Sequence, residues 1–186
     1  MDKYDIAMFF HIIGIAGIFG GIGTNLAVLH YVRRAPDVKA VLSILPIGPA
    51  AARVIQLFAI LALASGAYIV EDEWNWGDAW VYVATVTFFI LLALSPLVLA
   101  PRMKAAGMEA GRLGEGPIPP SLRAKLNDPV VTTVQRAMTT ATIGIVYLMT
   151  IKPGTAEALI AMAIAVICGV ALSARAWMGR AHADSD

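Results

Sequence analysis

His11 is the only histidine that lies within an apolar stretch and away from its ends, which makes it the residue best suited to chemistry. His11 lies in the run 6–32, which has about 27 residues and would extend roughly 40 Å as a helix. At about 100° per residue, His11, Gly14, Gly21 and Asn25 fall within roughly 80° of one another. An imidazole on such a face either forms a hydrogen bond to a neighbouring helix or binds haem iron or copper. We therefore predict that this face contacts protein and that His11 is a candidate metal ligand.

Two arginines lie within later apolar stretches and could bind an anion. Arg53 and Gln56 occur in the first turns of the stretch 51–70, and Arg136 occurs in 129–151. An arginine at the centre of a bilayer costs about 2.5 to 3.5 kcal/mol on insertion scales. Each side chain therefore either extends to the phosphate layer or binds an anionic group such as a lipid phosphate, a propionate or a carboxylated substrate.

Polar side chains also recur along one side of the stretch 129–151. Since lipid offers no hydrogen-bond partners, we expect this polar stripe to face protein. The stripe consists of Thr132, Arg136, Thr139, Thr140, Tyr147 and Thr150. The predicted cofactor-binding residues are therefore His11, Asn25, Arg53, Gln56, Arg136, Thr139, Thr140 and Tyr147, with His11 as the metal ligand.

The usual residue sets for enzymatic chemistry cannot be assembled from this sequence. It offers no Ser/His/Asp nucleophile set, phosphate-binding glycine loop, HExxH motif or paired carboxylates within an apolar stretch. The one cysteine, Cys168, excludes an internal disulfide and every CxxC motif. Because Cys168 lies in an apolar run, we expect it to be a small core residue. The sequence therefore assigns no reaction.

The composition of the chain indicates that a membrane surrounds these residues. Of the 186 residues, 59% are hydrophobic and 15% are charged, and the mean hydropathy is +0.73. These values exceed those of an ordinary soluble domain. A net charge of +1 provides no basic footprint for nucleic acid, so no nucleic-acid partner is expected. The first apolar run is too long for a signal peptide, so we expect it to stay in the mature protein.

Five apolar stretches predict an all-α polytopic transmembrane bundle that forms a single domain over residues 1–186. The expected spans are 6–32, 51–70, 79–100, 129–151 and 155–178. Pro96 is expected to bend the third span and Pro101 to end it. The stretch 102–128 is rich in glycine, proline and basic residues, and predicts an aqueous loop with a short helix near 121–126.

Local signals refine this arrangement. Asp37 is a plausible N-cap for a short helix over 37–45. The segment Lys152, Pro153, Gly154 predicts a tight turn that makes the last two spans antiparallel neighbours. Small residues at helical spacing predict close helix approach in the first and last spans. These are Gly17 and Gly21, and then Ala161, Ala165 and Gly169.

Lysine and arginine predict the orientation of the bundle. Most of the 14 basic residues fall after spans one and three and after the last span, which five crossings place on one side. Cytoplasmic segments carry such an excess, so the N-terminus is predicted outside and the C-terminus in the cytoplasm. The expected location is a bacterial inner membrane.

Three short features resemble a family of small bacterial integral membrane proteins that is known as a domain of unknown function. They are His11 in a glycine-containing first helix, the segment EDEWNWGDAW at 71–80 and the segment VYLMTIKPG at 146–154. More distantly, the first-helix histidine is similar to that of copper-resistance D proteins and of the haem-binding membrane protoporphyrinogen oxidase. That likeness implies that His11 lies on the metal side and that Arg53 or Arg136 meets propionates.

The leading hypothesis from the sequence is a membrane protein that binds an amphipathic anionic cofactor or lipid, with haem b foremost. Two other functions stay open. The polar stripe could belong to a transporter or channel for a small solute or metal ion, and the small-residue faces could dock an accessory subunit onto a larger membrane complex. Expected partners are membrane lipids and either a second copy of the chain or that larger complex.

Overall fold

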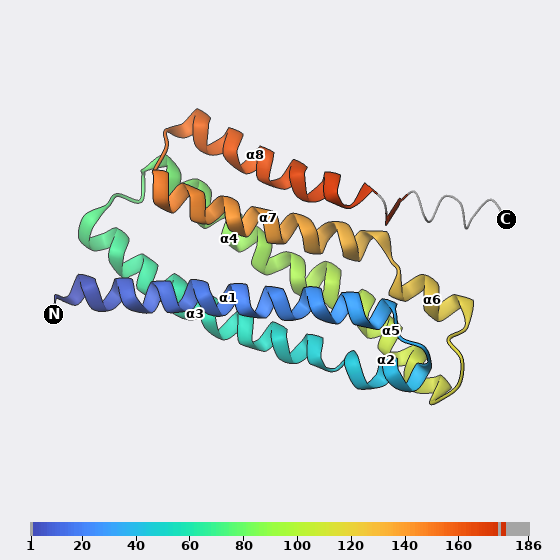
Figure 1. Cartoon of the computed structure of the whole chain (residues 1–186). Coiled ribbons are helices and arrows are strands. Elements are labelled where there is room, and N and C mark those ends of the chain that lie inside the picture. Colours follow the sequence, from blue (N-terminus) through green and yellow to red (C-terminus); the bar gives the residue numbers. More distant parts are fainter. Residues whose placement is uncertain (1, 175, 178–186) are drawn as a thin grey trace. The chain divides into compact units, whose positions relative to one another are not determined.

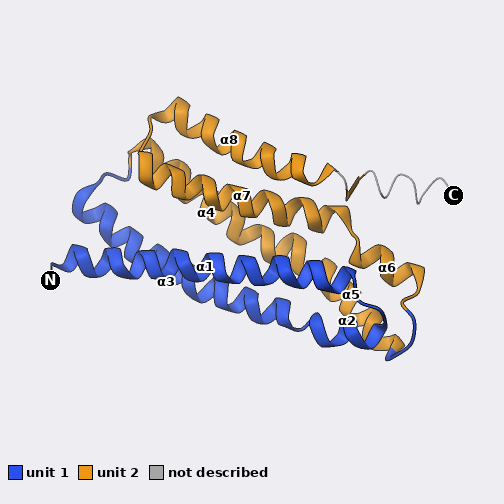
Figure 2. Ribbon diagram, in the orientation of Figure 1, with its two compact units in different colours: residues 1–76, 114–117 blue, residues 77–113, 118–186 orange. Residues whose placement is uncertain are grey.

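The structure is a computed structural model that describes residues 2–174, 176 and 177 of the chain. These residues form eight α-helices and one short π-helix, without a strand (Figure 1). The prediction of an all-α fold is therefore confirmed. The chain divides into two compact units, drawn in different colours in Figure 2. Unit 1 comprises residues 1–76 and 114–117, and unit 2 comprises 77–113 and 118–186.

Unit 1 consists of two long helices joined by a short one. These are α1 (Lys3–Arg33), α2 (Val38–Ile44) and α3 (Ile47–Glu73). Asp37 caps α2 as predicted, because its Oδ1 accepts a hydrogen bond of 2.7 Å from the Ala40 amide. Asp2 caps α1 in the same way, and forms a reciprocal capping box with Asp5.

The segment 114–117 belongs to unit 1 through a backbone contact with the start of α2. The Val38 N–H donates to the Gly116 carbonyl oxygen over 3.0 Å. Gly116 has a φ of +103°, a conformation that side chains with a Cβ rarely adopt. Glycine at this position therefore allows the turn that brings the carbonyl to Val38.

Unit 2 contains the remaining helices. In chain order they are α4 (Ala79–Leu94), the π-helix η1 (Ser95–Leu99), α5 (Ala100–Leu113), α6 (Pro120–Leu126), α7 (Pro129–Ile151) and α8 (Thr155–Leu172). Helix α7 packs against both α4 and α8. Its buried Ala141, Ile145 and Leu148 join residues of these two helices in one apolar cluster. The cluster stabilises the helices by close van der Waals packing, since lipid provides no hydrophobic driving force between them.

The turn between α7 and α8 is as tight as predicted. Lys152 adopts a left-handed conformation with φ of 54°, and its N–H donates to the Leu148 carbonyl over 2.8 Å. At the start of α8, Glu157 accepts a hydrogen bond of 3.1 Å from the Gly154 N–H. The two helices consequently pack as neighbours, which confirms the predicted hairpin.

The third apolar stretch differs from its prediction at Pro101. The helical path does not end there but continues as α5 to Leu113, so the aqueous loop expected over 102–128 is wrong for its first part. The reason is the π-helix around Pro96, in which the Ala100 N–H donates to the Ser95 carbonyl, five residues back. This changed register accommodates prolines that an unbroken α-helix would exclude. The short helix expected near 121–126 is confirmed as α6.

Four segments of the described chain are long and apolar enough to cross a membrane, and they are Lys3–Arg33, Val38–Glu73, Ala79–Leu113 and Thr155–Leu172. Helix α7 has 23 residues, as expected for the fourth span, but it carries the polar stripe and is not among these four segments. Helix α8 ends at Leu172, and the predicted end at residue 178 lies outside the described residues. Cys168 is exposed on α8, so its predicted place in the core is wrong.

Candidate functional site

His11 is held by a hydrogen bond that determines which ring nitrogen remains open. Its Nδ1 lies 2.8 Å from the Ala62 carbonyl oxygen of α3. A carbonyl oxygen can only accept, so Nδ1 carries the proton and donates it. In the neutral imidazole, Nε2 then keeps its lone pair. The half-buried ring therefore presents one nitrogen that can bind a metal or accept a hydrogen bond.

The glycines of α1 explain how α3 comes close enough for this contact. A Cβ added at Gly14 would lie 2.8 Å from the Ala62 Cβ, and one at Gly21 would lie 2.3 Å from Ile55 Cγ1. Gly17 faces Phe58 at a similarly short distance, 2.1 Å. Larger residues would separate the helices. The predictions that this face of α1 contacts protein and permits close helix approach are therefore confirmed.

The other candidate residues of unit 1 lie away from His11. Asn25 is beside Gly48, where an added Cβ would be 3.8 Å from the Asn25 Oδ1. Asn25 follows His11 by 14 residues in one helix, which corresponds to roughly 21 Å. Arg53 and Gln56 are exposed on α3, and Arg53 precedes Ala62 by nine residues or roughly 14 Å. Unit 1 therefore does not gather these side chains around the imidazole.

The threonines of α7, in unit 2, direct their hydroxyl groups to their own helix. Thr139 Oγ1 donates to the Gln135 carbonyl over 2.8 Å, and Thr140 Oγ1 donates to the Arg136 carbonyl over 3.1 Å. Such bonds satisfy a hydroxyl without any partner outside the helix. Tyr147 is 47% exposed, so the chain covers only part of the polar stripe. The stripe therefore supplies fewer free polar groups than the sequence suggested.

Arg136 contacts the end of the neighbouring helix. Its guanidinium donates to the carbonyl oxygen of Leu172, the last residue of α8. Carbonyl groups at a helix C-terminus lack partners in the helix and carry partial negative charge, so a cation is favourable there. Ser173 satisfies another of these groups, since its hydroxyl donates to the Gly169 carbonyl over 3.0 Å. The arginine thus has a structural partner that the sequence did not reveal.

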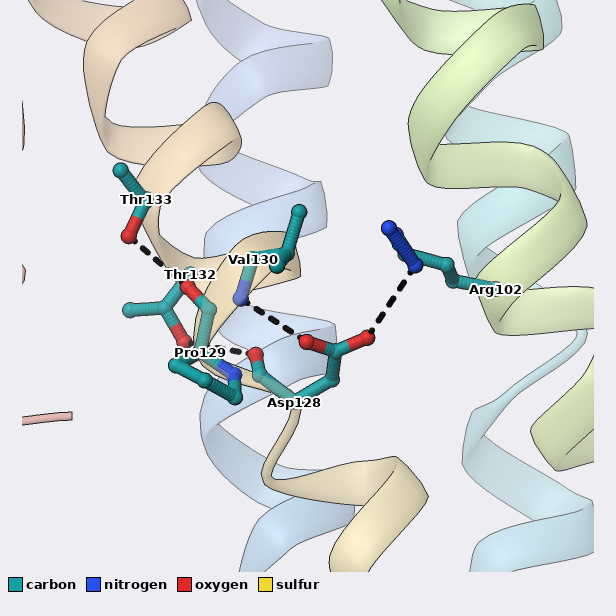
Figure 3. A network of polar contacts seen from close by, with 6 residues as sticks. All are labelled: Arg102, Asp128, Pro129, Val130, Thr132 and Thr133. Atoms are coloured by element: carbon teal, nitrogen blue, oxygen red, sulfur yellow. Dashed lines mark hydrogen bonds and ion pairs between the residues drawn. The ribbon is translucent and has the colours of Figure 1, made fainter. Parts of the chain in front are cut away.

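A second charged contact, shown in Figure 3, fixes the start of α7. Asp128 Oδ1 accepts from the Val130 N–H over 2.8 Å, while Oδ2 lies 3.7 Å from Arg102 NH1 of α5. Thr132 and Thr133 also return their hydroxyl protons to backbone carbonyls in this first turn. No role was predicted for Asp128 from the sequence, although an aspartate just before Pro129 is a typical sign of a helix start.

The described residues provide a single nitrogen ligand at His11 rather than a complete metal cage. Nowhere in the part of the chain that the structure describes do three or more His, Cys, Asp or Glu side chains gather to hold a metal ion. The other described histidine, His30, is exposed at the end of α1 and contacts Arg34 over 2.7 Å. A metal bound at His11 would therefore need most of its ligands from another source.

The comparisons with known proteins agree with the membrane fold. Residues 5–153 match the family described as predicted integral membrane protein DUF2269. No curated protein and no solved structure matches the chain. These comparisons do not show the distant likeness to copper-resistance D proteins or to membrane protoporphyrinogen oxidase. The match includes His11, the acidic and tryptophan-rich link and the whole of α7, and the chain therefore belongs to the DUF2269 family of integral membrane proteins.

Proposed function

We propose that this integral membrane protein binds haem, with His11 as an axial ligand. The observation that carries the proposal is the hydrogen bond from His11 Nδ1 to the Ala62 carbonyl oxygen, which leaves the Nε2 lone pair open. Metal-binding histidines almost always donate their other ring N–H to a carbonyl, a carboxylate or water, and this bond fixes the tautomer and the ring orientation. His11 therefore already has the second contact that such ligands need.

The number of protein ligands favours haem over a bare metal ion. Zinc in a protein takes about three to four side-chain ligands, and none of the described residues forms a group of that size. A porphyrin supplies the equatorial nitrogens itself, so a single axial histidine suffices. With one cysteine in the sequence, covalent attachment through a CxxCH motif is excluded. The haem in this proposal is therefore bound non-covalently, and we take it to be haem b.

The membrane setting also suits an amphipathic ligand. Haem combines an apolar ring with two anionic propionates, and His11 lies in an apolar helix long enough to cross a bilayer. Of the two arginines predicted to meet propionates, Arg53 shares unit 1 with His11, whereas Arg136 contacts Leu172 in unit 2. We place the protein in a bacterial inner membrane with its N-terminus outside, in line with its lysine and arginine distribution.

The absorbance spectrum of the purified protein tests this function. Protein isolated from haem-supplied cells is expected to show a Soret band and bound iron, and His11→Ala is expected to remove both. His30→Ala is the matched control, because it removes an exposed histidine from the same helix. A colourless, iron-free wild type would contradict the proposal, as would a His11→Ala variant that keeps its Soret band.

A further inference from the structure

We infer that Gly66 of α3 is a positioning residue that makes room for the His11 ring. A Cβ added at Gly66 would lie 2.8 Å from His11 Cε1 and 3.0 Å from His11 Nδ1. Side chains essentially never approach a Cβ so closely, so the ring fits only because this residue has none. The identity of the ligand at this site rests on the proposed function, but the role of Gly66 in orienting the His11 ring does not.

Helix α3 provides both the space and the hydrogen-bond acceptor for the imidazole. Gly66 and Ala62 are four residues apart and therefore lie on one side of the helix, one turn from each other. The His11 ring contacts Gly66 while its Nδ1 reaches the Ala62 carbonyl oxygen. Any side chain at position 66 would therefore displace the ring from the acceptor.

The neighbouring polar group leaves this acceptor to His11. Ser65 is buried, and its hydroxyl donates to the Leu61 carbonyl over 2.6 Å but approaches the Ala62 carbonyl only to 3.3 Å. The His11 Nδ1 distance to the same oxygen is 2.8 Å, which is the shorter contact. The imidazole is thus the principal side-chain donor to this carbonyl, and losing the contact would free the ring to adopt either tautomer.

The tautomer of His11 tests this role without any ligand. The full chain, labelled with 15N-histidine and reconstituted in lipid nanodiscs, is examined by NMR, and His11→Asn identifies the His11 signals. The wild type is expected to hold the proton on Nδ1, and Gly66→Ala is expected to show a mixture or the Nε2–H form. Gly48→Ala is the control, because Gly48 lies on the same helix as Gly66 and its added Cβ would come no closer than 3.8 Å to Asn25 and Val28 of α1. An Nε2–H wild type overturns the inference, and so does a Gly66→Ala variant with the wild-type tautomer.

A double variant distinguishes a clash with His11 from a general defect. Thermal unfolding is measured for Gly66→Ala, for His11→Ala and for the two combined. If the new Cβ meets the imidazole, Gly66→Ala is expected to lower Tm in the wild-type background and to have little effect once His11 is alanine. Equal losses of Tm in both backgrounds overturn the inference. If Gly66→Ala alone does not fold, the inference is still tested, because the double variant without the His11 ring is then expected to fold.

Haem titration separates this role from the proposed function. Gly66→Ala is expected to bind added haem roughly ten-fold or more weakly than wild type, which is typical of the loss of a contact that orients a metal ligand. Gly48→Ala is expected to bind haem as wild type does. If wild type binds no haem while Gly66→Ala still shifts the tautomer, the proposed function fails and the role of Gly66 stands. If wild type and Gly66→Ala bind haem equally, the role of Gly66 fails.

Discussion

The helix pairs α1–α3 and α7–α8 are packed alike but differ in what becomes of their polar groups. Each pair approaches through glycine, at Gly14 against Ala62 in unit 1 and at Gly169 against Ala137 in unit 2. In α7 the threonine hydroxyls donate to backbone carbonyls of α7 itself or of the residue before it, and Arg136 donates to one of α8. In α1 the histidine makes one such bond and keeps a second nitrogen open.

This difference shows that the number of polar residues on a membrane helix does not locate a binding site. A threonine hydroxyl can return its proton to the carbonyl four residues earlier, so a row of threonines is compatible with lipid or with tight helix contact. An imidazole has two nitrogens on opposite sides of the ring, and one backbone acceptor can satisfy only one of them. We therefore prefer the site with fewer polar residues, at His11, as the proposed ligand site.

The largest contrast between the pairs is expected in haem binding. His11→Ala should lower the affinity for added haem by roughly a hundred-fold or more, because it removes the proposed axial ligand itself. Thr139→Val and Thr140→Val should leave the affinity within about two-fold, because their hydroxyls are satisfied inside α7. Titration monitored by absorbance measures all three variants. If the threonine variants lost haem as His11→Ala does, α7 would contribute to haem binding as much as α1 does.

The next effect tests the feature that the two pairs share. At Gly169 an added Cβ would lie 2.5 Å from the Ala137 Cα, a backbone atom that cannot swing aside. Gly169→Ala is therefore expected to cost about 1–3 kcal/mol of unfolding free energy by overpacking. Chemical denaturation in detergent measures this loss. Gly23→Ala is the control, because no atom lies within 4 Å of its Cβ, and a loss equal to that of Gly169→Ala would contradict the explanation.

A smaller loss is expected from the contact between Arg136 and the end of α8. Arg136→Met keeps much of the side-chain volume but leaves the Leu172 carbonyl without its cation, at an expected cost of about 1–2 kcal/mol. The same substitution at Arg53, which is exposed on α3, should cost less than about 0.5 kcal/mol. The unfolding free energies of the two variants provide the test. Equal effects would show that the Leu172 contact adds no stability.

The smallest expected effect concerns the aspartates that cap the first helix of each pair. Asp128→Ala removes the bond to the Val130 N–H and the ion pair with Arg102, and should cost about 1 kcal/mol. Asp2→Ala should cost about 0.5 kcal/mol, because that cap is exposed and lies at a helix end that can fray. Thermal unfolding of the two variants shows which of them loses more stability. A larger loss for Asp2→Ala than for Asp128→Ala would contradict this prediction.

Local signals were sufficient to predict most of the helices. The bounds expected for the fourth span, 129–151, match α7, and Asp37 caps α2 as its position predicted. The path through Pro101 could not be predicted in this way, because it depends on the π-helical register set five residues earlier. A proline rule that assumes α-helical hydrogen bonds fails where those bonds have already shifted.

The candidate site was only partly predictable. The helical wheel identified the face of α1 that carries His11 and its glycines, since their spacing alone places them together. It could not identify Ala62, Gly66 or Leu172, because alanine, glycine and leucine contribute backbone atoms or empty space here rather than chemistry of their own. Arg136 was predicted either to extend to the phosphate layer or to bind an anion, and neither alternative pointed to the Leu172 carbonyl oxygen that its side chain contacts.

By itself, the sequence determined that this chain is a membrane protein of long apolar helices, with one histidine well inside the first helix and another at its end. Those features follow from composition and from spacing along the chain, which any helix preserves. The tertiary structure decided which polar groups are already satisfied and which nitrogen of His11 stays open. That choice depends on backbone carbonyls from residues far away in the chain, and only packing brings them within hydrogen-bond distance.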